Sequence, residues 1–339
     1  MARKKSPKKN PKKNPAKRRK KAHLPILIVQ HAPHEHPAAL RRALESQGLS
    51  THWIHPYRGE HYPGVSEIGG MVSLGGPMCA NDEHEHSWIA EEIALLRDCV
   101  DEGLPTVGIC LGGQMLARAL GGRVEQNPIS EVGWFEVRVN EEGLKDPIIS
   151  AGGVSPVVYH WHGDTFHLPA GAVLLADSAG CARQAYRYGK HAYGFQFHPE
   201  ADHQLVLEWL ETEGVEDDIM AMRRSGDVAS VQDAATQREG ALSGEKGSLK
   251  ITAAIGSLFR TARAKPVAGV LMSKILKWIE RGTLLELEYK GSLGKPAHIQ
   301  GRILSVLAIA AGEFVIFQEE TTLLWPIRTC DIRRLTPAE

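Results

Sequence analysis

One short stretch limits what this chain can fold into: the run Val107-Gly-Ile-Cys-Leu-Gly-Gly-Gln114. An apolar, strand-like segment ends at Cys110, and two glycines and a helix-compatible segment follow it. The glycines remove side-chain bulk around a sharp turn between a strand and a helix. The N-terminus of that helix favours a thiolate and points free N–H groups at any anion that forms beside it. We therefore expect a nucleophilic cysteine at the apex of a strand–turn–helix unit.

The charged residues are distributed unevenly along the 339-residue chain, although its formal net charge is zero. Residues 1–22 hold 12 of the 40 Lys and Arg and no acidic residue, so the rest of the chain is acidic. Lysines mixed with Pro and Asn can neither pack nor hold a helix, which predicts a disordered basic tail. Such a tail binds RNA, DNA or an anionic surface, or serves only to keep the protein soluble.

Composition and cysteine usage favour a cytoplasmic protein. With 42% hydrophobic and 24% charged residues, the chain is long enough for two or three domains with their own cores. No apolar run approaches the roughly 18 residues that span a bilayer, and Leu24–Val29 is too short for a signal-peptide core. The spacing of the cysteines fits neither a disulfide framework nor a CxxC zinc site. They are Cys79, Cys99, Cys110, Cys181 and Cys330.

Strands and helices alternate through the first half of the chain, which predicts an α/β domain with a mostly parallel sheet flanked by helices. Loops at the carboxyl ends of the strands then form the site, and both Cys110 and Gly75-Gly76 lie at such ends. Shorter strands follow from residue 132, and a last helix closes the domain near residue 212. The predicted strands are 24–30, 68–74, 105–109, 134–139, 157–161, 173–178, 182–188 and 192–197, and the helices are 37–47, 88–100, 113–120 and 202–210.

The patterns divide the chain into four parts: the tail of residues 1–22, an α/β domain over 23–212, a linker over 213–266 and a small domain over 267–339. The linker is polar and rich in Gly, Ala and Ser, with a possible amphipathic helix over 249–264. The last part begins with a helix over 270–280. Five short strands after it predict a small Sm-like or SH3-like β-barrel, at 284–289, 299–307, 313–318, 323–328 and 330–335.

A second motif supplies partners for the cysteine. A strand ends at His198, Pro199 terminates it, and Glu200 lies close enough to orient the imidazole. Cysteine, histidine and carboxylate from separate strand ends make a nucleophile, a general base and an orienting group. The loop Leu74-Gly75-Gly76-Pro77, at the end of a neighbouring strand, can supply one backbone N–H to an oxyanion beside the thiol, and Leu111 can supply another.

These motifs resemble, in order and spacing, the class I (triad) glutamine amidotransferase domain, which has a flavodoxin-like fold. More narrowly, residues 24–210 resemble stand-alone proteins similar to the amidotransferase half of GMP synthase. The resemblance rests on Gly75-Gly-Pro-Met78, Gly108-Ile-Cys-Leu-Gly-Gly-Gln114, Ala119-Leu-Gly-Gly122, Glu131-Val-Gly-Trp134, Trp161-His-Gly-Asp164 and Gln196-Phe-His-Pro-Glu200.

The resemblance implies hydrolysis of the glutamine side-chain amide to glutamate and ammonia through a γ-glutamyl thioester on Cys110. His198 would pass a proton to the departing ammonia and then activate water. The residues that the resemblance places around the glutamine are Gly75, Gln114, Val132, Gly133, Trp134, His162, Gly163 and Asp164. Trp134 and Trp161 also fit a simpler interpretation as ordinary core aromatics.

The chain shows no phosphate-cradling glycine loop with lysine, so the acceptor of the ammonia is missing from it. Three alternatives follow: a synthetase partner takes the ammonia, the triad hydrolyses another γ-glutamyl compound, or the domain is idle until it binds a partner. A different class of function is an RNA- or ribosome-associated protein that uses the tail and the barrel, with the amidotransferase domain as a scaffold.

We expect neither a cofactor nor a metal ion. The early part of the chain is rich in histidine, but no set of these residues has the i, i+4 helical spacing or the Cys partners typical of zinc. The histidines considered are those at positions 31, 34, 36, 52, 55, 61, 84 and 86.

Overall fold

The computed structural model describes residues 24–262, apart from 225 and 227, and beyond them the backbone of five strands. The predicted tail of residues 1–22 and the predicted helix over 270–280 lie outside the described residues. The elements of the first part are β1 (Ile26–Val29), α1 (Ala38–Ser46), β2 (Thr51–Ile54), β3 (Gly70–Ser73), α2 (Trp88–Asp101), β4 (Thr106–Ile109), α3 (Leu111–Ala119), β5 (Val124–Glu136), β6 (Arg138–Val139), α4 (Glu141–Lys145), β7 (Val157–Phe166), β8 (Ala172–Asp177), β9 (Ala185–Tyr188), β10 (Ala192–Phe195), α5 (His203–Leu210), α6 (Val215–Arg224) and α7 (Ala234–Ala262).

An eight-stranded sheet in the order β2-β1-β3-β4-β10-β9-β8-β6 forms the centre of this part. The first five strands run parallel, and β9, β8 and β6 complete the sheet in antiparallel pairs. The α/β fold expected for this part is confirmed. The alternation of strands and helices in the sequence did not predict β2 or the first half of β5. Strand β2 is only partly buried, so its sequence lacks a continuous apolar run. Strand β5 pairs with β7 outside the main sheet.

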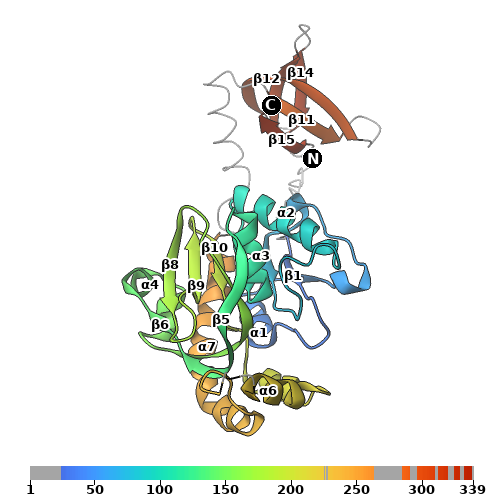
Figure 1. Cartoon of the computed structure of the whole chain (residues 1–339). Coiled ribbons are helices and arrows are strands. Elements are labelled where there is room, and N and C mark those ends of the chain that lie inside the picture. Colours follow the sequence, from blue (N-terminus) through green and yellow to red (C-terminus); the bar gives the residue numbers. More distant parts are fainter. Residues whose placement is uncertain are drawn as a thin grey trace, which may run out of the picture.

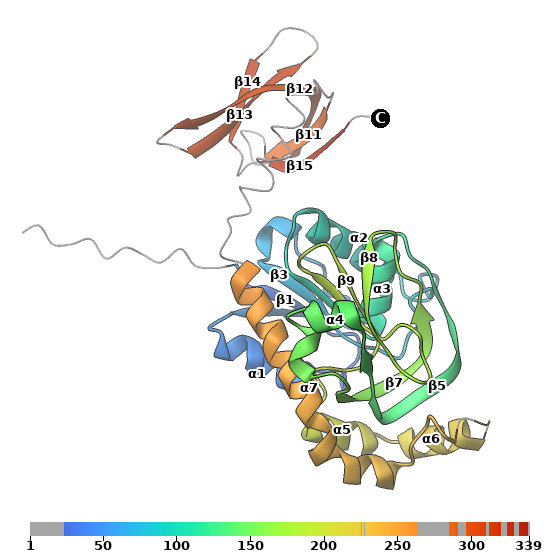
Figure 2. The same ribbon diagram turned by 90° about the vertical axis from the view of Figure 1, so that its left-hand side faces the viewer.

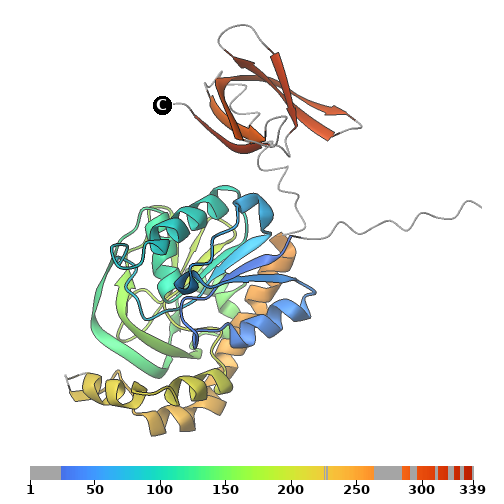
Figure 3. The ribbon, with the colours of Figure 1, turned by 90° about the vertical axis from the view of Figure 1, so that its right-hand side faces the viewer.

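Helices cover both faces of the sheet (Figure 1). On one face, Leu27, Val29 and Met71 pack against α2 and α3. On the other face, Ile28 and Val72 pack against α1 and α7. Figure 2 shows α7 lying beside α1, and in Figure 3 the sheet lies between the teal helices and the orange α7.

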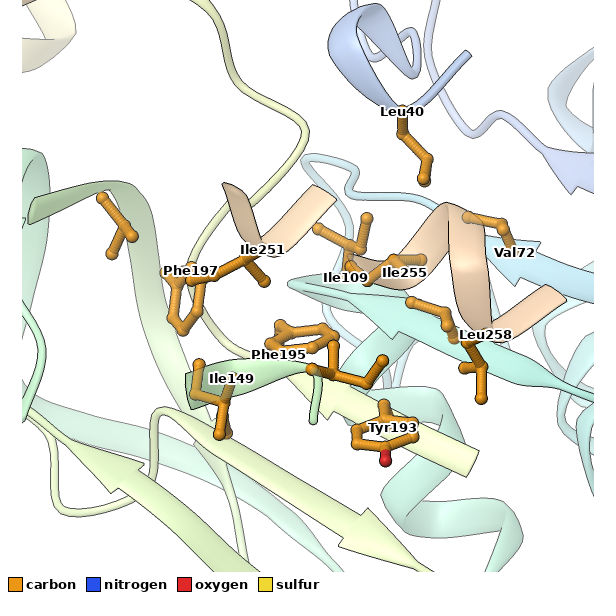
Figure 4. Packing of buried hydrophobic residues seen from close by; sticks show 14 of the residues in the cluster. Leu40, Val72, Ile109, Ile149, Tyr193, Phe195, Phe197, Ile251, Ile255 and Leu258 are labelled. Atoms are coloured by element: carbon orange, nitrogen blue, oxygen red, sulfur yellow. The ribbon is translucent and has the colours of Figure 1, made fainter. Parts of the chain in front are cut away.

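Helix α7 lies in the segment predicted as a linker, and here the structure differs from the prediction. Ile251, Ile255 and Phe259 are fully buried in the same core cluster as the strands. Figure 4 shows Ile251 and Ile255 among the side chains of Ile109, Phe195 and Phe197, which come from the strands that carry the site. Helix α7 therefore belongs to the packed α/β part of the chain.

The backbone described at the C-terminal end forms a separate antiparallel sheet in the order β14-β13-β12-β11-β15. All five strands expected there are present within a few residues of their predicted limits. Closure of this sheet into an Sm-like or SH3-like barrel stays a prediction. The strands are β11 (Leu285–Lys290), β12 (Pro296–Ile309), β13 (Gly312–Glu319), β14 (Leu324–Arg328) and β15 (Ile332–Pro337).

The register of the parallel strands explains why distant motifs meet. Val29 lies opposite Ser73, Ser73 opposite Gly108, and Ile109 opposite Phe195. The carboxyl ends of β1, β3, β4 and β10 are therefore neighbours along one edge of the sheet, and the loops that follow them gather there.

Candidate active site

Cys110 occupies the sharp turn between β4 and α3. Its backbone has a φ of 50° and a ψ of −109°, and only one other non-glycine residue among those described has a positive φ. The peptide N–H of Cys110 donates to the carbonyl of Phe195 over 2.8 Å, and its carbonyl accepts from the N–H of Gln114 over 3.0 Å. The strained turn is thereby held from both sides, as expected for a nucleophile presented at a strand end.

Glycines are required on both sides of this turn because the backbone is crowded. A Cβ at Gly112 would lie 2.2 Å from the carbonyl oxygen of Ser73, and a Cβ at Gly108 would lie 2.3 Å from the carbonyl oxygen of Gly112. No side chain fits at such distances. The glycines that mark the motif in the sequence therefore let α3 start directly against β3.

His198 and Glu200 follow β10 and complete a row of three groups. The N–H of His198 donates to the carbonyl of Tyr159 over 2.8 Å, which anchors the loop to β7. The Nδ1 of His198 lies 2.8 Å from Oε1 of Glu200, and both side chains are almost completely buried. The Cys110 thiol is also among the groups that raise the pKa of His198. Since Nδ1 faces Glu200, Nε2 is the nitrogen left for the thiol.

The charge on His198 follows from these neighbours. Burial opposes protonation of the imidazole, but the Glu200 carboxylate and the Cys110 thiol outweigh it and hold the pKa of His198 well above its ordinary value. An imidazolium beside a cysteine stabilises the thiolate, which is the nucleophilic form.

The glycine loop after β3 passes between the histidine and the cysteine turn. A Cβ on Gly75 would lie 2.9 Å from Cε1 of His198, and one on Gly76 would lie 2.8 Å from Cδ2 of Leu111. The carbonyl of Leu74 accepts from the N–H of Gly112 over 3.0 Å and so fastens the loop to α3. Among the described residues, no backbone acceptor is recorded for the N–H of Gly76 or of Leu111, the two groups expected to hold an oxyanion.

Of the residues expected around the substrate, Gln114 and the segment from His162 to Asp164 lie near this site, and the segment, which was expected to be a loop, belongs to strand β7. Gln114 is buried, and its Nε2 donates to Oε1 of Gln196 over 3.3 Å. Gln196 in turn places its Nε2 3.8 Å from the sulfur of Cys110. Gly163 is exposed and Asp164 is half-buried within β7, the strand that also places the Trp161 carbonyl 3.6 Å from the Cys110 sulfur.

The backbone of Val132 to Trp134 differs from the expectation that it holds glutamine. The N–H of Val132 donates to Ser230 over 2.9 Å, and its carbonyl accepts from the N–H of Gln232 over 2.8 Å. The side-chain amide of Gln232 pairs with the N–H and the carbonyl of Trp134 over 3.0 Å and 2.9 Å. The segment between α6 and α7 thus pairs with one edge of β5 through Val231. On its other edge, β5 pairs with β7, where Gly133 lies opposite His160.

The two tryptophans have different surroundings. Trp134 is buried against Tyr159 and α7, and its indole N–H donates to the carbonyl of Gln237, so the interpretation as a core aromatic describes it well. Trp161 is half-buried, and its ring meets Trp209, which itself stands edge-on to His198 at 5.1 Å between ring centroids. Trp161 and Trp209 therefore form an aromatic wall beside the imidazole.

Three residues at the site were missed by the sequence interpretation. Glu35 follows β1, and its carboxylate lies within 4.8 Å of ligand atoms of His198 and Glu200. Burial raises the pKa of Glu35 above its ordinary value, although His198 acts in the opposite direction. His31 and Glu92 form a buried pair behind the glycine loop. The sequence offered one signal for His31 and Glu35: both follow β1, a strand parallel to β3, so they lie at the same edge of the sheet as the glycine loop.

Two clusters of described residues bring three metal-ligating atoms within 4.8 Å of one another, and neither was predicted. In the first, the Nε2 of Gln184 lies 2.7 Å from Glu131, 3.3 Å from His160 and 3.5 Å from His162, so an amide nitrogen fills the space between the ligand atoms. Burial lowers the pKa of His160 to about 3, which leaves it neutral. This cluster is a hydrogen-bonded network that ties β5 and β7 to the loop before β9.

The second cluster consists of Glu35, His198 and Glu200 and belongs to the candidate catalytic groups. Because His198 already pairs through Nδ1 with Glu200, a metal ion there would compete with the contact that orients the imidazole. Two of the histidines considered from the sequence lie beside partly exposed carboxylates. His36 pairs with Glu208 and His55 with Glu60.

The other cysteines differ from Cys110. All four described cysteines are free thiols. Burial, with a contribution from Asp164, raises the pKa of Cys79 to about 11, and burial raises that of Cys181. Both therefore remain protonated, unlike a thiol that faces an imidazolium. Among the described residues, no helix is long and apolar enough to cross a membrane.

Comparison with known protein families matches residues 38–215 to the family "Glutamine amidotransferase class-I". The glutamine amidotransferase-like protein YfeJ of Salmonella typhimurium is 35% identical over 176 residues, which cover 51% of this chain and 74% of that protein. A glutamine-hydrolyzing GMP synthase of Chromobacterium violaceum is 38% identical over 140 residues, 39% of this chain. The match covers only 25% of that synthase.

The comparison with solved structures also finds glutamine amidotransferases. A glutamine amidotransferase from Methylobacillus flagellatus superposes with a TM-score of 0.64 and 28% identity, over 71% of this chain and 96% of that one. A glutamine amidotransferase from Thermotoga maritima superposes with a TM-score of 0.62 and 26% identity, over 70% of this chain and 98% of that one.

Proposed function

This chain belongs to the class I glutamine amidotransferases, and on that premise we propose that Cys110, His198 and Glu200 hydrolyse the side-chain amide of glutamine. The observation that carries the proposal is the row of buried groups in which Glu200 holds His198 over 2.8 Å and His198 faces the Cys110 thiol. A thiolate, a charged imidazole and an orienting carboxylate are the parts that acyl transfer from an amide needs.

The first half of the reaction forms a thioester. The Cys110 sulfur attacks the δ-carbon of the glutamine side chain, and the carbonyl oxygen becomes an oxyanion that accepts from the N–H groups of Gly76 and Leu111. His198 donates its proton to the amide nitrogen as the carbon–nitrogen bond breaks. Ammonia leaves, and the γ-glutamyl group stays on the sulfur.

The second half reverses the roles of the groups. His198, now neutral, removes a proton from water, and the resulting hydroxide attacks the thioester carbonyl within the same oxyanion site. The carbon–sulfur bond breaks, glutamate leaves, and His198 is again protonated beside the Cys110 thiolate. We propose that Gln114 and the β7 residues His162 to Asp164 hold the amino-acid part of the substrate.

Release of ammonia from glutamine by the full chain tests the proposal. Cys110→Ala is expected to lower kcat by about 10⁴-fold or more, because the nucleophile is lost. Cys99→Ala is the matched control, since Cys99 is buried between α2 and β3 and is expected to leave kcat within about threefold. Full activity in Cys110→Ala would overturn the proposal.

The destination of the ammonia is a second part of the proposal. The match to the GMP synthase covers a quarter of that protein, so this chain corresponds to one portion of a larger enzyme. We propose that the ammonia passes to a separate synthetase, or that the physiological substrate is another γ-glutamyl compound. A metabolite screen that compares wild type with Cys110→Ala distinguishes the two: a consumed γ-glutamyl compound identifies the substrate, and consumption of glutamine alone favours a partner.

We also propose that the enzyme works in the reducing cytoplasm, because a thioester mechanism requires a free thiol at Cys110 and the four described cysteines are free. The 12 basic residues among residues 1–22 support the alternative role in binding RNA or ribosomes. That role predicts RNA binding that weakens steeply with salt and is lost when residues 1–22 are removed. Absent or salt-insensitive binding would count against it.

A further inference from the structure

We propose that the buried pair His31–Glu92 holds the Gly75–Gly76 peptide in the orientation that the oxyanion site requires, and that His31 does so as an imidazolium. The inference rests on the proposed function, because it concerns the N–H of Gly76. His31 and Glu92 are positioning residues in this account, since they act on the substrate only through the peptide.

Two successive contacts lead from Glu92 in the protein interior through His31 to the Gly75 carbonyl. The Nδ1 of His31 lies 2.9 Å from the carbonyl oxygen of Gly75, and its Nε2 lies 3.0 Å from Oε2 of Glu92. Both side chains have no exposed surface. The ring of Trp88 stacks on the imidazole with 5.1 Å between centroids and 11° between planes. The imidazole therefore has little freedom to turn away from the peptide.

Holding the Gly75 carbonyl also fixes the Gly76 N–H, because the two belong to one planar peptide group. The peptide is trans, so its C=O and N–H point in opposite directions. A carbonyl directed at His31 therefore directs the N–H away from His31. A glycine loop has more rotational freedom than other sequences, so a peptide between two glycines gains most from such a restraint.

The hydrogen-bonding partners indicate that His31 is charged. A carbonyl oxygen and a carboxylate only accept hydrogen bonds, so both ring nitrogens must donate, which requires the doubly protonated ring. Burial disfavours the charge, but Glu92 and the Gly75 carbonyl raise the pKa of His31 above its ordinary value. Glu92 also accepts from Ser73 over 2.6 Å and from Tyr62 over 2.7 Å, which holds the carboxylate in place.

Two consequences follow for the reaction. A charged donor on the Gly75 oxygen polarises the peptide and makes the Gly76 N–H a stronger donor to an oxyanion. In addition, the residues that restrain the peptide all belong to the described α/β part of the chain: His31 follows β1, and Glu92 lies on α2. The oxyanion site is therefore formed before any partner binds, which favours an enzyme that is active alone over one that is idle until it is bound.

The experiment measures ammonia release from glutamine and, separately, the alkylation of Cys110 by iodoacetamide in the full chain. His31→Gln and Glu92→Gln are the test variants, and His55→Gln is the control, because it makes the same change in a histidine–carboxylate pair, His55–Glu60, that does not contact the glycine loop. Alkylation at a saturated carbon creates no oxyanion, so it reports on the thiolate alone. The Cys110 peptide is followed by mass spectrometry, and thermal unfolding shows whether each variant is folded.

Both test variants are expected to lower kcat by about 10- to 100-fold with KM within about threefold, since loss of a whole oxyanion donor costs about 10²–10³-fold. The alkylation rate is expected to stay within about twofold of wild type, and the control His55→Gln is expected to keep the wild-type kcat. If His31→Gln does not fold, Glu92→Gln decides the question, because it keeps the histidine and its stacking.

Two results would overturn the inference. Folded variants with wild-type kcat would show that the pair does not act on the oxyanion, and an alkylation rate that falls with kcat would show that the pair acts on the thiolate instead. A wild-type chain that releases no ammonia from any γ-glutamyl amide would overturn the proposed function itself, together with this inference.

Discussion

At the scale of single residues, the contact between His198 and Glu200 sets both the direction and the charge of the imidazole. Burial alone would keep His198 neutral, but the carboxylate at 2.8 Å and the nearby thiol raise its pKa well above the ordinary value. In the proposed reaction, His198 is therefore protonated when glutamine binds and acts as the acid for the leaving ammonia. The enzyme loses this acid only when the pH rises through the raised pKa.

Glu200→Gln is expected to lower kcat by about 10²–10⁴-fold, because the imidazole loses both its orientation and its charge partner. It is also expected to move the alkaline limb of the kcat/KM profile to lower pH. Since Glu200 raises the pKa of His198, its loss lets the imidazolium lose its proton at a lower pH. Profiles of wild type and variant from pH 5 to about 10 measure the shift.

Glu208→Gln is the control for this change, because Glu208 also pairs with a histidine, His36, but at an exposed position. Its profile is expected to match that of wild type. An alkaline limb that stays in place, or moves to higher pH, in Glu200→Gln would show that His198 is not the acid whose charge Glu200 controls.

The proposed catalytic residues could be selected from the sequence because each of them follows an apolar strand within a short motif. Cys110, His198 and the glycine loop each come directly after a strand, and the ends of neighbouring parallel strands lie side by side. The pair His31–Glu92 could not be inferred in this way. Its members are 61 residues apart, and Glu92 lies on a helix whose sequence resembles that of any amphipathic helix with a charged face.

At the scale of elements, α7 shows how a segment that resembles a linker becomes part of the core. Its glycines reduce helix propensity, which favoured the linker interpretation. In the structure they allow close contact: a Cβ at Gly244 would lie 2.4 Å from the Trp134 ring, and one at Gly247 would lie 2.5 Å from the Val157 carbonyl. A sequence pattern records the weak propensity, but it does not record the neighbours that compensate for it.

Helix α7 also supports the catalytic loop directly. The hydroxyl of Thr252 donates to the carbonyl of Pro199, and Glu245 accepts from the N–H of His203 over 2.7 Å. The loop that carries His198 and Glu200 is therefore held between β7 on one side and α7 on the other. We infer that damage to the packing of α7 weakens the site as well as the fold.

Leu258→Ala is expected to lower the free energy of unfolding by about 2–5 kcal/mol, because the side chain is buried between the sheet and α1 and leaves a cavity. Leu242→Ala is the matched control on the same helix: Leu242 is 64% exposed, and the same change is expected to cost less than about 0.5 kcal/mol. Urea unfolding of the full chain measures both. Equal losses would mean that α7 does not pack as described.

At the scale of the whole molecule, the groups that carry the proposed reaction all lie within residues 24–210. The described residues that hold these groups in place extend to α7. The five C-terminal strands form a separate sheet with its own pairing. The strands were predictable because each alternates or is continuously apolar between turn residues, whereas the closure of a barrel depends on side-chain packing that no local pattern records.

Removal of residues 263–339 is expected to leave kcat and KM for glutamine within about threefold of the full chain, because no group assigned to the reaction lies there. Removal of residues 234–339 takes α7 away as well and is expected to give an unfolded or inactive protein. Ammonia release by the two shortened chains measures the difference. Loss of activity in the first would assign the C-terminal sheet a part in catalysis.

The central claim is that Cys110 carries a γ-glutamyl group during turnover, and mass spectrometry of the full chain quenched in acid tests it most directly. We predict an added mass of one γ-glutamyl group on the Cys110 peptide within the first turnovers with glutamine. We also predict that this adduct disappears when the substrate is exhausted and that it is absent in Cys110→Ala. Turnover of glutamine without this adduct at any time, or with an equal adduct in Cys110→Ala, would contradict the account.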